Sequence, residues 1–174
     1  MSDKRIESVQ ISIKPKWCEL IAKGEKTVEV RKTKPKFKTP FKVYIYCTSV
    51  KSLNLQEYVN IHQATGGAVD DWSGKVIGEF ICDYIYENMS YDCEGPCVSV
   101  SDLKKYANGK PLYGWHISDL VIYDKPKELS EFEKPCNHNC FVPCPHYRGK
   151  EYECEKPIIT RPPQSWCYVE EVKE

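Results

Sequence analysis

Long apolar runs are absent from this 174-residue sequence, and none approaches the length of a membrane-spanning helix. Residues 1–5 lead directly into a strand-like pattern, without the apolar stretch of a secretory signal. A net charge is absent as well, because 25 Lys+Arg balance 25 Asp+Glu, which argues against a protein that holds nucleic acid through bulk positive charge alone. We therefore expect a cytoplasmic protein with no membrane partner.

The charges are unevenly distributed along the chain. Residues 1–51 contain 13 Lys+Arg and 5 Asp+Glu, whereas residues 52–174 contain 12 and 20. Such an asymmetry indicates that one face meets an anion while another stays in solvent. The basic loop of residues 31–42, with Phe37 and Phe41, suits single-stranded nucleic acid. Solubilising lysines anchored by two buried phenylalanines would give the same pattern.

Aromatic residues favour a sheet-rich fold, since the chain has 12 Tyr and 4 Trp. Its length fits one domain of residues 1–174 with a real hydrophobic core. Helix patterns begin at Pro15 and occur around 55–61 and 99–107. Strand patterns occur at 9–13, 26–32, 43–48, 75–86, 112–123 and 166–172. Irregularly spaced strands with short helices between them predict an α+β fold, a mixed and partly closed β-barrel with short flanking helices.

A compact motif follows the first strand. Residues 12–17 read Ser-Ile-Lys-Pro-Lys-Trp, and they are followed by Ile21-x-x-Gly24-x-Lys26-Thr27-x-Glu29-x-Arg31. This series resembles the signature of the ASCH domain family, whose core is Gly-x-Lys-x-x-Glu-x-Arg. Residues 74–80 resemble the next barrel strand of the family. Residues 113–118 and 165–170 resemble segments of its phage-associated and bacterial members.

The resemblance implies a PUA-like β-barrel with a cleft beside the first helix, and a role in binding RNA or a modified nucleotide. The ammonium group of Lys26 is a point charge and the guanidinium group of Arg31 is planar with several N–H donors, and together they suit phosphate or a base edge. Strand alternation places Glu29 and Arg31 on one face, which Lys26 joins only if it still lies in the turn. The predicted ligand-binding residues are Lys14, Lys16, Trp17, Lys26, Glu29, Arg31, Lys32 and Ser118.

Several of these residues have a structural alternative. Glu29 and Arg31 can form a same-face ion pair that stabilises the sheet. Trp17 lies on an apolar helix face, which favours core packing over base stacking. The sequence leaves these alternatives open.

A hydrolase is the alternative function, because the resemblance implies that some ASCH relatives hydrolyse RNA or acylated nucleosides. In amidohydrolase-type members a threonine nucleophile occupies the position of Glu29. A carboxylate cannot replace a lysine-activated hydroxyl in forming an acyl-enzyme, which argues against that mechanism. In another chemistry Lys26 stabilises a developing anion, Glu29 is the general base and His116 transfers a proton. We expect a binding module in preference to an enzyme.

Cysteine is abundant, and residues 134–161 read as an insertion rich in Cys, Pro and His. Clustered cysteine in the cytosol indicates metal more often than disulfide. We expect a structural zinc in tetrahedral coordination and no organic cofactor, with free thiols as the alternative. A third function is a protein-interaction adaptor that uses this insertion. The predicted zinc ligands are Cys136, Cys140, Cys144 and Cys154, with His146 as an alternative to Cys154.

Overall fold

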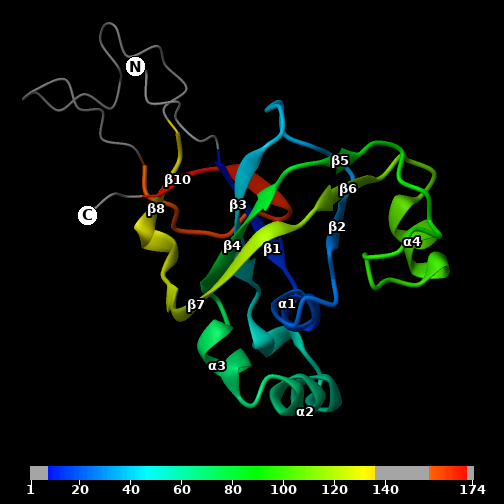
Figure 1. Cartoon of the computed structure of the whole chain (residues 1–174). Coiled ribbons are helices and arrows are strands. Elements are labelled where there is room, and N and C mark those ends of the chain that lie inside the picture. The colour runs from blue at the N-terminus through cyan, green and yellow to red at the C-terminus, as the bar shows by residue number, and fades with distance from the viewer. Residues whose placement is uncertain (1–7, 136–156, 172–174) are drawn as a thin grey trace, which may run out of the picture.

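The computed structural model describes residues 8–135 and 157–171. Its main sheet has five strands, which Figure 1 shows near the centre of the molecule. In spatial order they are β7 (Ser118–Lys127), β4 (Val76–Cys82), β3 (Phe41–Cys47), β1 (Ser8–Ile13) and β9 (Trp166–Tyr168). β1 runs parallel to β3, and the other neighbouring pairs are antiparallel.

Two smaller sheets complete the described strands. One has the order β2 (Val28–Arg31), β6 (Tyr113–His116) and β5 (Ile85–Tyr86), and the other pairs β8 (Phe132–Glu133) with β10 (Glu170–Glu171). The α+β class, the mixed sheets and the short helices are confirmed. The three sheets of the described residues do not join into a closed barrel.

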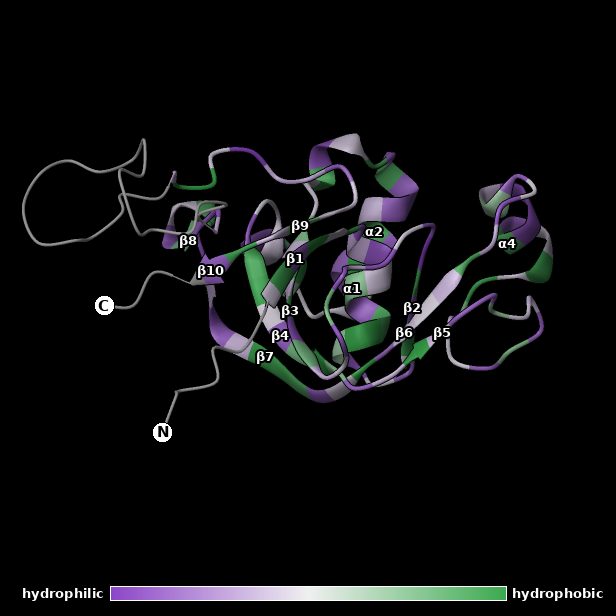
Figure 2. Cartoon of the chain, turned by 90° about the horizontal axis from the view of Figure 1, so that it is seen from above, coloured by the Kyte–Doolittle hydropathy of each residue, from purple (hydrophilic) through white to green (hydrophobic). Residues whose placement is uncertain are grey.

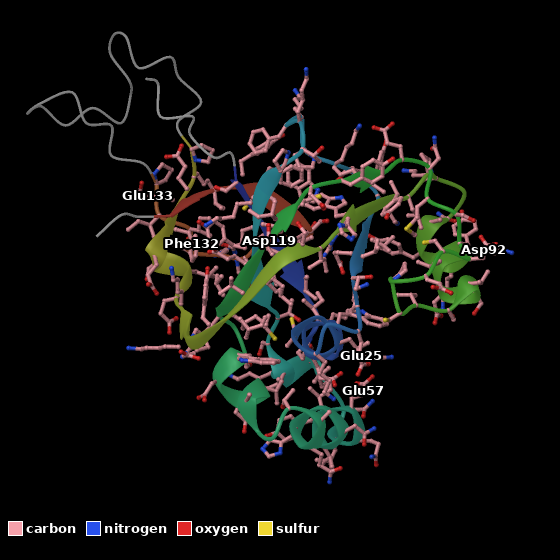
Figure 3. The ribbon with its side chains drawn as sticks, in the orientation of Figure 1. Glu25, Glu57, Asp92, Asp119, Phe132 and Glu133 are labelled. Carbon is pink, nitrogen blue, oxygen red and sulfur yellow. The ribbon has the colours of Figure 1, made fainter. Side chains whose placement is uncertain are left out.

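Two segments predicted as single strands each divide between the two larger sheets. Residues 75–86 form β4 and β5, and residues 112–123 form β6 and part of β7. Between β6 and β7 the Ile117 N–H donates to the carbonyl oxygen of Thr27. Asp119, labelled in Figure 3, takes a left-handed φ of 45° beside a register shift. These bends carry the chain from the small sheet to the main sheet.

Four α-helices flank the described sheets: α1 (Pro15–Ala22), α2 (Leu55–Ala64), α3 (Ala68–Trp72) and α4 (Val100–Ala107). α1 begins at Pro15, as predicted, and Gly24 at φ +75° forms the turn after its end. α4 is capped by Ser99, whose hydroxyl accepts the N–H of Asp102. Among the helices of residues 8–135 and 157–171, none is both long and apolar enough to cross a membrane.

The main core lies between the main sheet and α1. Val9, Ile11 and Ile13 alternate along β1 and enter this core, which also contains Trp115 of β6. In Figure 2 hydrophobic colouring is prominent on the central strands, whereas α2 is largely hydrophilic. A second, smaller cluster packs α4 against β2 through residues that include Val30. The second cluster thus holds α4 against β2, whereas α1 packs on the main core.

The two phenylalanines of the basic loop have different positions. Phe41 is fully buried in the main core. Phe37 is half-buried, and its ring centre is 4.8 Å from that of Tyr168. Phe41 is therefore not available to stack a base, and this part of the nucleic-acid interpretation of the loop is wrong.

Replacing Gly78 of β4 tests the close contact between the backbones of β4 and β7. An added Cβ would lie 2.3 Å from the carbonyl oxygen of Val121 and 3.1 Å from Cα of Ile122. Because backbone atoms cannot move aside cheaply, we expect Gly78→Ala to lower the free energy of unfolding by about 2–3 kcal/mol. In the control Gly114→Ala the atom nearest to the added Cβ is Sδ of the flexible Met89, at 2.8 Å. We expect this variant to lower the free energy of unfolding by about 1 kcal/mol. Equal losses in urea unfolding would contradict the close backbone contact.

Candidate functional site

Glu29 lies between two cations at the start of β2. Its Oε1 is 2.9 Å from Nη2 of Arg31, and its Oε2 is 3.4 Å from Nζ of Lys26. The exposed fractions are 3% for Lys26, 6% for Glu29 and 8% for Arg31. Charged residues are seldom buried so deeply unless they are paired. The ion pair between Glu29 and Arg31 is formed, and Lys26 joins it because β2 begins at Val28, which leaves Lys26 in the preceding turn.

Most of the donors of Lys26 are used within the protein. Its Nζ donates to the carbonyl oxygens of Val28 at 2.9 Å and Pro96 at 2.6 Å, and it also forms an ion pair with Glu29. An ammonium group has three N–H donors, so the two carbonyl oxygens take two of them. The geometry gives Lys26 a positioning role, which holds the start of β2 against the loop before α4. The ligand contact predicted for Lys26 from the sequence stays a prediction.

The loop that meets Lys26 depends on Gly95. Gly95 has a φ of +104°, and its carbonyl oxygen accepts the N–H groups of Thr27 and Val28. An added Cβ would lie 2.6 Å from Oγ1 of Thr27 and 3.0 Å from Cγ2 of Val28. Glycine alone combines this backbone conformation with so close an approach. The next carbonyl, that of Pro96, is thereby held against Lys26.

Arg31 ties β2 to the main sheet. Its Nη2 donates to the carbonyl oxygen of Ser12 at 2.7 Å and forms the ion pair with Glu29, and its Nη1 donates to Oγ of Ser165 at 3.4 Å. Two buried atoms, Oε2 of Glu29 and Nε of Arg31, have no hydrogen-bond partner in the part of the chain that the structure describes. Such atoms are uncommon in folded proteins, which marks the cluster as a candidate functional site.

A cleft of about 350 Å³ opens beside this cluster. Its volume falls in the range of sites that hold small molecules. The end of β1 and α1 contribute Ile13, Lys14 and Trp17 to its lining. α4 contributes further residues, and Gln164 comes from the segment before β9.

Asp102 and Tyr106 line the cleft from α4, one helical turn apart. The helix pattern at residues 99–107 predicted this helix, but such a pattern carries no information on the surface against which the helix packs. Leu103 is buried with β2 residues, and this packing brings the neighbouring side chains to the cleft. Burial raises the pKa of Tyr106, so its hydroxyl stays protonated at neutral pH. The residue is still 39% exposed, which leaves it accessible to a ligand.

The family model of the ASCH domain matches residues 11–143, which is more than half of the chain and includes the whole buried cluster. The chain belongs to the ASCH domain family. No curated protein matches this ASCH domain. It shares its fold with ZmASCH from Zymomonas mobilis, since the crystal structure of a serine-to-alanine mutant gives a TM-score of 0.56 at 16% identity, over 94% of this chain and 88% of that chain.

A tyrosine-to-phenylalanine mutant of the same Zymomonas mobilis protein gives a TM-score of 0.50 at 18% identity, over 70% of this chain and 76% of that chain. At such low identity the likeness concerns the fold alone. Individual residues of this ASCH domain therefore have to be judged from its own geometry.

Besides Lys26, Glu29 and Arg31, four of the ligand-binding residues predicted for this ASCH domain lie at or beside the cleft. Lys14 and Trp17 line the cleft together with the buried cluster. Lys16 and Lys32 do not line it, but each Nζ lies 4.7 Å from the centre of a ring that does, Lys16 over Trp17 and Lys32 over Tyr106. Trp17 also packs against the main core, so it contributes to the core as well as to the cleft lining.

His116 does not line the cleft. It pairs with Val28 across β2 and β6, so its side chain lies on the opposite face from Glu29. Its Nδ1 is 2.6 Å from Oδ1 of Asp83, and hydrogen bonding to the imidazole lowers the pKa of that carboxyl group. The predicted catalytic group of Lys26, Glu29 and His116 is therefore not brought together.

Ser118 also lies away from the cleft lining. It is the first residue of β7, and its hydroxyl donates to the carbonyl oxygen of Ile81 in β4 at 2.9 Å. Its hydrogen bond thus belongs to the main sheet. The motif around it resembles the family, but the fold gives this serine no place beside the buried cluster.

The predicted zinc ligands fall outside the described residues. Within residues 8–135 and 157–171, no three or more His, Cys, Asp or Glu side chains are grouped to hold a metal ion. The family match ends at residue 143, inside the predicted Cys-rich insertion. Zinc binding by Cys136, Cys140, Cys144 and Cys154, or by His146 in place of Cys154, stays a prediction from the sequence.

Replacing Lys26 tests its positioning role. Lys26→Met leaves Glu29 short of one cation and two carbonyl oxygens without their donor. We expect the free energy of unfolding to fall by about 3 kcal/mol. The control Lys14→Met removes an exposed lysine from the same cleft and should change stability by less than about 0.5 kcal/mol. Urea unfolding measures both, and a Lys26→Met protein as stable as the control would contradict the geometry.

Proposed function

We propose that the cleft of this ASCH domain binds one nucleotide of RNA, with modified bases among its ligands. The observation that carries the proposal is a pair of aromatic rings at the cleft, Trp17 from α1 and Tyr106 from α4, each with a lysine ammonium over it. Aromatic rings accept bases by stacking, and neighbouring lysines meet phosphates. The cleft volume of about 350 Å³ is sufficient for a small planar ligand.

Hydrogen bonding at the floor of the cleft supports a base as the ligand. Nη2 of Arg31 contacts Glu29 and Ser12, whereas Nη1 has only the long contact with Ser165 at 3.4 Å and Nε has no partner among the described residues. Nη1 and Nε are therefore the donors of the cluster with capacity left for an acceptor on a base. The exposed lysines at the rim, Lys14 among them, are better suited to phosphate than the buried Lys26, which donates to two carbonyl oxygens.

Two other functions remain as alternatives. A hydrolase acting on RNA or on an acylated nucleoside requires a proton-transfer group beside Lys26 and Glu29, and His116 does not supply it from its position in β6. An adaptor function would use residues 134–161, most of which lie outside the described residues. A cytoplasmic location and a relation to phage-associated or bacterial members likewise stay proposals.

Tyr106→Ala tests the cleft. We expect the affinity for short single-stranded RNA to fall by roughly tenfold, because one stacking surface is lost. The matched control is Tyr84→Ala, since Tyr84 is 56% exposed and does not line the cleft. Fluorescence anisotropy at one fixed salt concentration measures the affinities of wild type and both variants. Equal affinities of the two variants would place RNA elsewhere on the protein.

We also propose a structural zinc in the Cys-rich insertion, on the cysteine spacing alone. The purified protein is then expected to contain zinc at a stoichiometric level, measured by elemental mass spectrometry. Replacing Cys136 and Cys140 by serine should remove that zinc. A wild-type protein that is purified without metal, and does not take up added zinc, would contradict this proposal.

A further inference from the structure

The segment between β2 and β3 has a lysine at every second position from residue 32 to residue 38. We call residues 32–38 the lysine segment. Its four lysines are all exposed, whereas Pro35 between them is buried and Phe37 is half-buried. In Figure 1 the loop that contains this segment crosses the top of the molecule, at the end opposite α2 and α3. The segment thus directs its charges to solvent while its apolar residues face the protein.

Contacts with β9 fix the lysine segment. Nε1 of Trp166 donates to Oγ1 of Thr33 at 3.0 Å, and the N–H of Lys36 donates to the hydroxyl of Tyr168 at 3.0 Å. The ring of Phe37 lies 4.8 Å from that of Tyr168, measured between centres. A loop that served only for solubility would not need these contacts. They hold the four lysines on one defined surface.

The lysine segment starts at the rim of the cleft. Nζ of Lys32 lies 4.7 Å from the ring centre of Tyr106, which lines the cleft. The next lysine, Lys34, lies 5.8 Å from the ring centre of Tyr113 and forms an exposed ion pair with Glu87. Exposed ion pairs contribute little to stability, so this lysine can exchange its partner for a phosphate. The cleft and the lysine segment therefore form one continuous basic surface.

We propose that the lysine segment binds the sugar-phosphate backbone of a single-stranded RNA, one nucleotide of which occupies the cleft. This inference rests on the proposed function of the cleft and extends it from a nucleotide to a strand. Alternate residues of a protein chain are at most about 7 Å apart, which is comparable to the distance between successive phosphates of an extended strand. Residues 1–51 hold 13 Lys+Arg against 5 Asp+Glu, so the field of the protein attracts a polyanion to this part of the chain.

The test compares two triple variants of the full chain. Lys34→Gln, Lys36→Gln and Lys38→Gln remove three charges from the lysine segment and spare Lys32 beside the cleft. The control variant carries the same change of net charge at exposed lysines outside both the segment and the cleft lining. Its substitutions are Lys51→Gln, Lys110→Gln and Lys125→Gln.

Each protein is titrated with an octaribonucleotide over a range of salt concentrations, and with the four ribonucleoside monophosphates. Loss of three phosphate contacts should reduce the slope of log affinity against log salt for the octamer by about 2 in the lysine-segment variant. The affinity for the octamer at low salt should fall by about tenfold or more. The monophosphate that binds the wild type should bind both variants as tightly, because the cleft is unchanged.

An octamer slope that is the same in the lysine-segment variant and in the control variant overturns the inference. If a monophosphate then still binds the wild type, the proposed function of the cleft stands without it. If neither the octamer nor any monophosphate binds the wild type, the proposed function itself has failed, and the inference fails with it. A decrease confined to the lysine-segment variant supports both.

Discussion

Burial of three charges at the start of β2 is the constraint on which the rest of the site depends. Removing a carboxylate from water costs several kcal/mol unless cations and hydrogen bonds replace the water. Here Lys26 and Arg31 supply the cations around Glu29, and both also donate to carbonyl oxygens, Arg31 to that of Ser12 and Lys26 to that of Pro96. These groups come from β1, β2 and the loop before α4. The cluster therefore forms only when those parts of the fold are in place.

This constraint separates the positive charges of the protein into two groups. In the cluster Glu29 offsets one of the two positive charges, and carbonyl oxygens take N–H donors of both cations, which leaves fewer donors for an outside anion. The exposed lysines at the cleft rim and in the lysine segment keep their charge available. A ligand that has both planar bases and a chain of negative charges fits a buried hydrogen-bonding cluster beside exposed lysines better than a free anion does. Single-stranded RNA has that character.

Local sequence signals predicted the parts of the fold that depend on local chemistry. Pro15 starts α1 and Ser99 caps α4, because proline geometry and hydroxyl capping act within one turn. The breaks that move the chain between sheets were missed, since apolar alternation continues through Ile117 although the pairing partner changes. The hydrogen bonding of Lys26 was also beyond the sequence, because Pro96, 70 residues away, provides one of its acceptors. The place of Tyr106 in the cleft depends likewise on how α4 packs on β2.

The most direct test of the account is a titration of the ¹⁵N-labelled protein with a short single-stranded RNA, followed by backbone amide chemical shifts. The account predicts that the largest shifts fall on the cleft lining, at Lys14, Trp17, Leu103 and Tyr106, and continue into residues 32–38. Residues of β8, where Phe132 and Glu133 are labelled in Figure 3, should stay unchanged. Shifts centred on β8, or on His116 and Asp83, with none in the cleft, would contradict it.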